Sequence, residues 1–119
     1  PSGGPLVQHS LVSMLEFYHL GKISLEWLVN KMCHAPAECF QVKERGFIRE
    51  GYYADLVVVD LYKPWVVSKE NILYHCGWSP FEGETFHSSV IMTFVNGNLV
   101  YNDGVFNEES RGMRLDFER

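Results

Sequence analysis

The chain has 119 residues, of which 46% are hydrophobic and 14% aromatic, and its formal net charge at pH 7 is −5. This apolar content excludes a disordered linker and predicts one modest domain or part of a larger globular body. The acidic balance without a basic stripe argues against nucleic acid and membrane as partners, and the lack of a long apolar run or signal segment predicts a cytoplasmic location.

The first 45 residues carry helical patterns. A first amphipathic helix is predicted by apolar residues at the spacing i, i+3, i+4 and i+7, which are Leu11, Met14, Leu15 and Tyr18. Gly21 ends this helix, and Ser24 is suited to cap a second helix with the same apolar pattern. Pro36 suits the first turn of a short third helix, because the N–H that proline lacks is not needed there.

Beyond residue 46 the pattern changes to strands. The apolar run Leu56–Val59 is short and β-branched, which predicts a buried strand. Residues 64–68, "PWVVS", predict an edge strand. Residues 88–104, "SSVIMTFVNGNLVYNDG", predict two strands of a meander joined at Asn96-Gly97, since both turn residues tolerate positive φ. The change near Gly46 suggests that residues 1–45 and 46–119 belong to different structural units of a larger body.

Cysteine and histidine residues do not form a recognisable local site. The cysteines are odd in number and include no CxxC pair, which favours reduced, buried thiols at Cys33, Cys39 and Cys76. The histidines form neither HxH nor HExxH, which favours structural or surface roles for His9, His19, His34, His75 and His87. The sequence contains no GxSxG elbow that would indicate a nucleophilic serine. Glu82 and Glu84 are more typical of solvated loop carboxylates than of an acid–base pair. From these residues we predict no catalytic residue and no metal ligand.

The loop "SGGP" at residues 2–5 is the local candidate for ligand binding. Backbone amides around Gly3 and Gly4 can approach a small anion because no Cβ stands in the way, and the next helix presents its positive end. Glycine loops before helices are also common connectors, so a simple connector is the alternative.

Several stretches resemble the cyclic amidohydrolases. Residues 34–61, "HAPAECFQVKERGFIREGYYADLVVVDL", are similar to the junction between the last barrel helix and a small β-sandwich in that family. The family order is an Asn-Pro-Ala-like turn, Gly-x-Ile, Gly and Ala-Asp-Leu-Val, which match Ala35-Pro36-Ala37, Gly46-Phe47-Ile48, Gly51 and residues 54–57. The segment "SPFEG" at residues 79–83 and the opening "PSGGPLVQHSL" narrow the resemblance to dihydroorotases and their close relatives. The opening looks most like a Bacteroidetes-type branch.

The resemblance implies an α+β fragment. Residues 1–45 would be the last helices of a (β/α)8 TIM barrel, with a substrate loop at residues 1–8, and residues 46–119 would be C-terminal strands of the amidohydrolase β-sandwich. The N-terminal portion of the barrel would be missing. The ligands that hold two divalent metals, usually zinc, in the family would be missing as well. These ligands are an HxH pair, a carboxylated Lys, two further His and an Asp.

The implied activity is that of a metal-dependent hydrolase of pyrimidine biosynthesis, which interconverts N-carbamoyl-L-aspartate and dihydroorotate. The family's metals lower the pKa of bound water and polarise the carbonyl. A fragment without the metal ligands is expected to bind no metal and to be inactive alone. Exposed apolar stripes left by the absent barrel predict a homo-oligomer or a partner chain.

Family members use backbone groups that match Ser2 and Gly3 to hold the substrate, so the resemblance implies substrate binding at Ser2, Gly3 and Gly4. The sequence departs from the family at residues 6–8, where Gly-x-Glu is common, and this leaves backbone roles rather than side-chain roles of Gln8 and His9 to carry over. Two alternatives stay open. One is a hydantoinase- or allantoinase-like fragment, and the other is a free-standing α+β interaction module.

Overall fold

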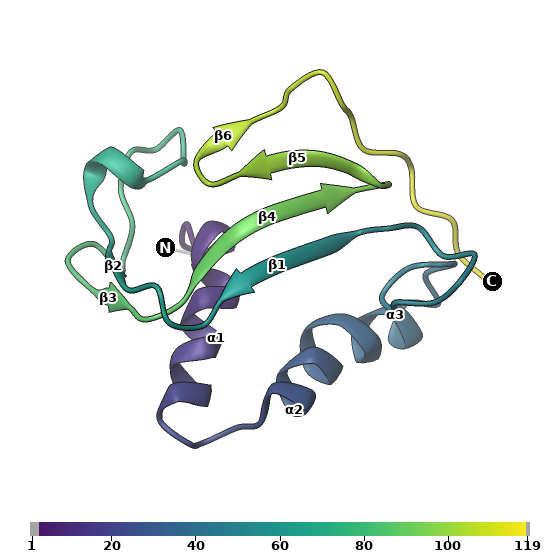
Figure 1. Ribbon diagram of the computed structural model, residues 1–119, viewed down its shortest axis with the longest axis horizontal. Helices are drawn as coiled ribbons and strands as arrows, with labels where there is room; N and C mark the ends of the chain where they lie inside the picture. Colours follow the sequence, from purple (N-terminus) through teal and green to yellow (C-terminus); the bar gives the residue numbers. More distant parts are fainter. Residues whose placement is uncertain (1–2, 119) are drawn as a thin grey trace. The chain divides into compact units, whose positions relative to one another are not determined.

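The computed structural model describes residues 3–118 (Figure 1). These residues form two compact units. Unit 1 combines residues 3–23 with Asp60–Ser89, and unit 2 combines Ser24–Val59 with residues 90–118. Ser2, one residue of the predicted substrate loop, lies outside the described residues. Both units mix helical segments with antiparallel strands, in agreement with the α+β class. The predicted boundary near Gly46, between parts of a larger body, stays a prediction.

Unit 1 contains one regular helix and several short elements. In chain order these are η1 (Val7–His9), α1 (Ser10–His19), β2 (Trp65–Val66), η3 (Lys69–Asn71) and β3 (Thr85–Phe86). The predicted helix is confirmed as α1, which is followed by Gly21 at φ +71°. It buries Leu15 of the predicted apolar face and also Val12, whereas Leu11, Met14 and Tyr18 are half-buried. The predicted short strand is also confirmed, since β2 pairs antiparallel with β3 and places Trp65 opposite Phe86.

Unit 2 begins with three helical segments in direct succession: α2 (Leu25–Val29), η2 (Asn30–His34) and α3 (Ala35–Cys39). The predicted cap is confirmed, because Ser24 Oγ accepts a hydrogen bond from the Trp27 N–H at 3.1 Å. The predicted short third helix with Pro36 in its first turn is confirmed by α3, and a π-helical turn that the sequence does not predict joins it to α2. Pro36 offers no N–H for an α-helical bond, and the wider turn, in which Ala35 N–H bonds Asn30 O, carries the chain past it.

The main sheet has the strand order β1-β4-β5-β6 and lies in unit 2 apart from its end residues Asp60 and Ser89 (Figure 1). Its strands are β1 (Leu56–Asp60), β4 (Ser89–Val95), β5 (Asn98–Asn102) and β6 (Val105–Phe106). The predicted hairpin is confirmed, with Asn96 and Gly97 at φ +52° and +81° between β4 and β5. β5 also pairs antiparallel with β6, so the predicted meander is confirmed.

Two burial predictions are wrong. The side chains Val57 and Val58 of β1 are 47% and 45% exposed, although the sequence predicts a buried strand. The cysteines Cys33, Cys39 and Cys76 are free, as expected, but all three are exposed. Neither β1 nor the cysteines contribute to the buried apolar core of the described residues, which has six members: Val12, Leu15, Leu28, Ala37, Val67 and Phe86. β-Branched residues favour a strand whether or not its faces are covered.

The connection between α3 and β1 is held by a close backbone contact and an ion pair. Gly46 has φ +82° and packs so tightly on α3 that a Cβ there would lie 2.3 Å from Ala37 Cβ. The Arg45 guanidinium stacks over the Tyr53 ring at 4.2 Å and pairs with the Asp55 carboxylate. Asp55 also accepts the N–H of the hairpin residue Asn96 at 2.9 Å, so this carboxylate joins the connection to the β4–β5 turn.

None of the helices within residues 3–118 combines the length and the hydropathy that crossing a bilayer requires.

Candidate functional site

The glycines of the opening loop lie exposed at the start of unit 1. A Cβ added at Gly3 would have no atom within 4 Å, and one added at Gly4 would meet only Leu6 Cγ, at 4.0 Å. Neither glycine has a positive φ. Packing among the described residues and backbone conformation therefore do not require glycine at either position, and both leave their backbone amides accessible.

Gln8, at the end of this loop, is bound on three sides by residues more than 60 positions away. Its backbone N–H donates to Tyr74 Oη at 2.7 Å. Its side-chain Nε2 donates to Asn71 O at 2.8 Å, and its Oε1 accepts the Leu73 N–H at 2.9 Å. The amide thereby satisfies two backbone groups of residues 71–73 as a neighbouring strand would.

His9 is fully buried and packed among four aromatic rings. Its ring centroid lies 5.8 to 5.9 Å from those of Trp65, Tyr74, Phe81 and Phe86. Nδ1 lies 3.3 Å from Ser79 Oγ, which also accepts the Phe81 N–H at 3.1 Å. Burial lowers the pKa of His9, so the imidazole is neutral near neutral pH. Its Nε2 is buried without a hydrogen-bond partner among the described residues.

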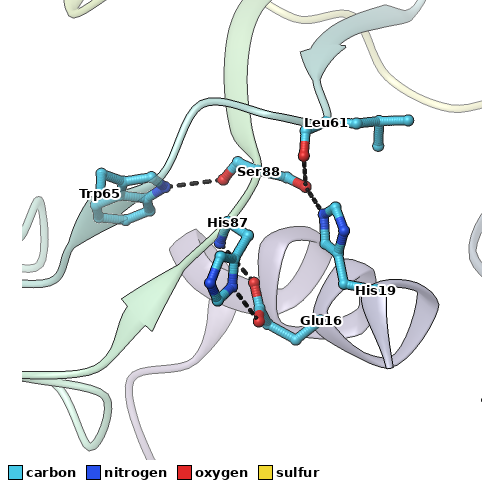
Figure 2. A network of polar contacts seen from close by, with 6 residues as sticks. All are labelled: Glu16, His19, Leu61, Trp65, His87 and Ser88. Atoms are coloured by element: carbon cyan, nitrogen blue, oxygen red, sulfur yellow. Dashed lines mark hydrogen bonds and ion pairs between the residues drawn. The ribbon is translucent and has the colours of Figure 1, made fainter. Parts of the chain in front are cut away.

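A second polar cluster joins α1 to the chain around the start of β4 (Figure 2). His19 Nε2 lies 2.8 Å from Ser88 Oγ, and that hydroxyl donates to Leu61 O at 3.1 Å. The hydroxyl proton is thus used, so the imidazole Nε2–H donates to Ser88. The Ser88 carbonyl accepts the Trp65 Nε1–H at 2.9 Å, and the serine is fully buried.

Glu16 supplies the other contact of α1 in this cluster (Figure 2). Its carboxylate accepts the His87 backbone N–H at 2.6 Å and lies 2.9 Å from His87 Nδ1. Burial alone would raise the pKa of Glu16, but the two hydrogen bonds from His87 and the electrostatic interactions with His87 and His19 outweigh it. The pKa of Glu16 is therefore lower than its ordinary value.

This cluster has the residue types of a catalytic triad but not its connections. The carboxylate of Glu16 holds His87, whereas the serine contacts the other imidazole, His19. A triad needs one imidazole that bridges the acid and the nucleophile, with the nucleophile proton directed at that ring. We therefore assign the cluster a structural role.

Cys33, which lies outside this cluster in η2, is not a candidate nucleophile either. Desolvation raises the pKa of its thiol, whereas a nucleophilic cysteine needs a lowered pKa.

The Glu16 contact predicts a loss of stability in acid. Because the folded-state pKa of Glu16 is below its ordinary 4.5, its stabilisation is complete above that value and is lost as the pH falls through the folded-state pKa. We expect Glu16→Gln to lower the free energy of unfolding by up to about 1 kcal/mol near pH 6, and by less near pH 3.5. Urea unfolding at both pH values measures this. An equal difference at the two values contradicts it.

Comparison with known proteins identifies the family. A model described as the amidohydrolase family matches residues 7–100. The chain belongs to the amidohydrolase family. A dihydroorotase from Pyrococcus horikoshii is 34% identical over 114 residues, which are 96% of this chain and 27% of that protein. A dihydroorotase from Thermococcus kodakarensis is 31% identical over 117 residues, which are 98% of this chain and 28% of that protein.

Solved amidohydrolase structures share the fold. The L-hydantoinase (dihydropyrimidinase) from Arthrobacter aurescens matches with a TM-score of 0.81 at 31% identity, over 88% of this chain and 24% of its own. The dihydropyrimidinase from Brevibacillus agri NCHU1002 matches with a TM-score of 0.81 at 30% identity, over 89% of this chain and 23% of its own. The chain therefore spans about a quarter of the length of these relatives.

Amidohydrolases generally depend on metal ions. Within residues 3–118, no group of three or more His, Cys, Asp or Glu side chains could hold one. The isolated histidines fit this: His9 is enclosed by rings, His19 binds a serine, and His34 Nδ1 lies 2.7 Å from Gly46 O. The described residues do not fit a metal centre, and we derive no reaction step through one here.

The anchoring of the amidohydrolase opening loop is a feature that sequence reasoning missed. The sequence predicts a structural or surface role for His9, and its burial among aromatic rings agrees with the structural alternative, but the sequence gives neither the partners of His9 nor a side-chain role for Gln8. Their partners lie in residues 71–81, which include Ser79 of the "SPFEG" segment. The resemblance of this segment to the family was the one signal in the sequence that could have pointed to the contact, but it did not say which residues the segment binds.

Proposed function

We propose that this chain is the C-terminal portion of a dihydroorotase of pyrimidine biosynthesis, which hydrolyses the cyclic amide of dihydroorotate and cyclises N-carbamoyl-L-aspartate. The observation that carries the proposal is the similarity to curated dihydroorotases over 96 to 98% of the chain. The fine assignments belong to the same proposal: residues 1–45 as late barrel helices, residues 46–119 as sandwich strands, and a Bacteroidetes-type branch.

The metal centre of the proposed enzyme would be built by barrel segments outside this chain. We propose two divalent ions, zinc in the simplest case, with all ligands outside residues 3–118, so the chain alone would be inactive. Large apolar side chains that stand exposed, such as Ile48, Tyr62 and Val7, support a chain that belongs to a larger body. They also support the expected homo-oligomer, and we propose that the enzyme works in the cytoplasm.

Within this enzyme the opening loop would bind the substrate. Backbone amides of Ser2, Gly3 and Gly4 would donate hydrogen bonds to the substrate carboxylate or ring, which is the role left to a loop without acidic or basic side chains. The exposure of Gly3 and Gly4, together with the lack of any internal need for glycine, supports this role.

A substrate panel tests the reaction. We expect the full-length, metal-loaded protein to hydrolyse dihydroorotate with a kcat/KM at least about 100-fold above that for hydantoin, dihydrouracil or allantoin. The hydantoinase and dihydropyrimidinase names of the matching structures make a hydantoinase-like enzyme the second candidate. Preference for hydantoin or dihydrouracil would establish that candidate and exclude dihydroorotase.

Replacing Gly3 tests the loop. Gly3→Val in the full-length protein is expected to raise KM for dihydroorotate about tenfold or more, because the new side chain occupies the space through which a ligand approaches the amides. The control is Gly112→Val, since Gly112 is also exposed, lacks a positive φ and has no atom within 4 Å of an added Cβ. Steady-state kinetics measure both. Equal KM values in the two variants contradict a binding role for the loop.

A further inference from the structure

We propose that Gln8 and His9 are positioning residues, which hold the opening loop in a binding-competent conformation by fixing its end to residues 71–81. This inference rests on the proposed function of the loop as a substrate site. Gln8 and His9 do not touch the substrate in this proposal. They act through the backbone that leads back to Gly4.

The loop needs such an anchor because of its composition. Glycine restricts the backbone least of all residues, so Gly3 and Gly4 alone would sample many conformations. Only three residues separate Gly4 from Gln8, so a fixed Gln8 limits how far the amides can move. Holding amides in place before the ligand arrives removes an ordering cost from binding.

Gln8 is the better suited of the two anchors to a precise test. Its amide uses both functions at once: the oxygen accepts the Leu73 N–H, and the nitrogen donates to Asn71 O. A carboxylate of the same shape keeps the first bond but places a negative oxygen against the Asn71 carbonyl. Once protonated, a carboxyl group can donate there again as the amide did.

His9 provides a second, independent anchor. Its ring fills the space between aromatic side chains, while Nδ1 reaches the Ser79 hydroxyl. Because Ser79 also caps the Phe81 N–H, the contact fixes the turn of the "SPFEG" segment to the start of α1. A phenylalanine at position 9 would keep the ring packing and lose only this polar link.

The experiment compares Gln8→Glu with Gln41→Glu in the full-length, metal-loaded protein. Gln41 is exposed and lies in unit 2, so its variant matches the charge change alone. Near pH 8 we expect Gln8→Glu to raise KM for dihydroorotate about tenfold with kcat within about twofold. The kcat/KM of the variant relative to wild type should rise as the pH falls toward about 6, whereas the ratio for Gln41→Glu stays flat.

Hydrogen exchange supplies a readout that does not depend on turnover. We expect the amides of Gly3, Gly4, Leu6 and Val7 to exchange faster in Gln8→Glu and in His9→Phe than in wild type, because the loop end is released. His9→Phe also keeps the test open if Gln8→Glu does not fold. Unchanged exchange together with an unchanged KM overturns the inference. Faster exchange in the two variants supports the anchoring even if the wild-type protein does not turn over dihydroorotate, and that second result would refute the proposed function.

Discussion

Gly46→Ala is expected to lower the free energy of unfolding by about 3 kcal/mol. Two costs add in this substitution. The φ of +82° is unfavourable for any residue with a Cβ, and that Cβ would lie 2.3 Å from Ala37 Cβ and 2.9 Å from Cys33 O. The second contact is with backbone, which cannot turn aside as a flexible side chain can.

The chain offers a matched control for the backbone cost. Gly51 has nearly the same φ, +83°, but an added Cβ there would meet no atom within 4 Å. Gly51→Ala should therefore cost only about 1 kcal/mol. Urea unfolding of the full-length protein measures both variants. If the two substitutions cost the same, the close approach of Gly46 to α3 does not exist in solution.

Asp55→Ala is expected to lower the free energy of unfolding by about 2 to 3 kcal/mol. Removal of the carboxylate leaves the Arg45 side chain, which is only 9% exposed, without its ion-pair partner. It also leaves the Asn96 N–H without its acceptor in the hairpin turn. The Asp55 side chain is 36% exposed, and for this reason the expected cost lies at or just below the lower end of the range for buried pairs.

Asp60→Ala is the control, because Asp60 lies at the end of β1, the strand that follows Asp55, and its Oδ1 accepts the Tyr62 N–H at 2.9 Å, which is a hydrogen bond and not an ion pair. Its loss should cost about 1 kcal/mol. The double variant Arg45→Met/Asp55→Ala should be more stable than the sum of the two single changes suggests, since no buried charge then remains unpaired. Strict additivity in urea unfolding would show that the Arg45 pairing contributes nothing.

Local features of the fold were predictable from the sequence. The Ser24 cap and the Asn96-Gly97 turn were predicted because each depends on backbone preferences within a few residues. Their outcome does not depend on what packs against them. The π-helical turn before Pro36 was missed because α- and π-helical bonds compete over the same short stretch, and the sequence pattern does not separate them.

Burial and the anchoring of the candidate site were harder to predict from the sequence. The exposure of Val57 and Val58 depends on what covers the sheet, which a β-branched run does not reveal. The bonds of Gln8 to Asn71 and Leu73 join residues 63 and 65 positions apart. Such pairs depend on the tertiary fold, so no local spacing of residues predicts them. The glycine loop can be chosen as a candidate from the sequence, because the absence of Cβ atoms is a property of the residues alone, and its binding role stays a prediction.

The widened turn at Asn30–His34 also governs the angular phase of α3. Each residue advances an α-helix by about 100° around its axis, so one residue more or fewer turns every later side chain by more than a quarter circle. Deleting a residue there would rotate Ala37 away from the strand-side connection, and Gly46 would lose the neighbour against which it fits. The irregular turn therefore sets which side of α3 faces Gly46. Shortening it to a regular helix would remove the close contact between Gly46 and Ala37.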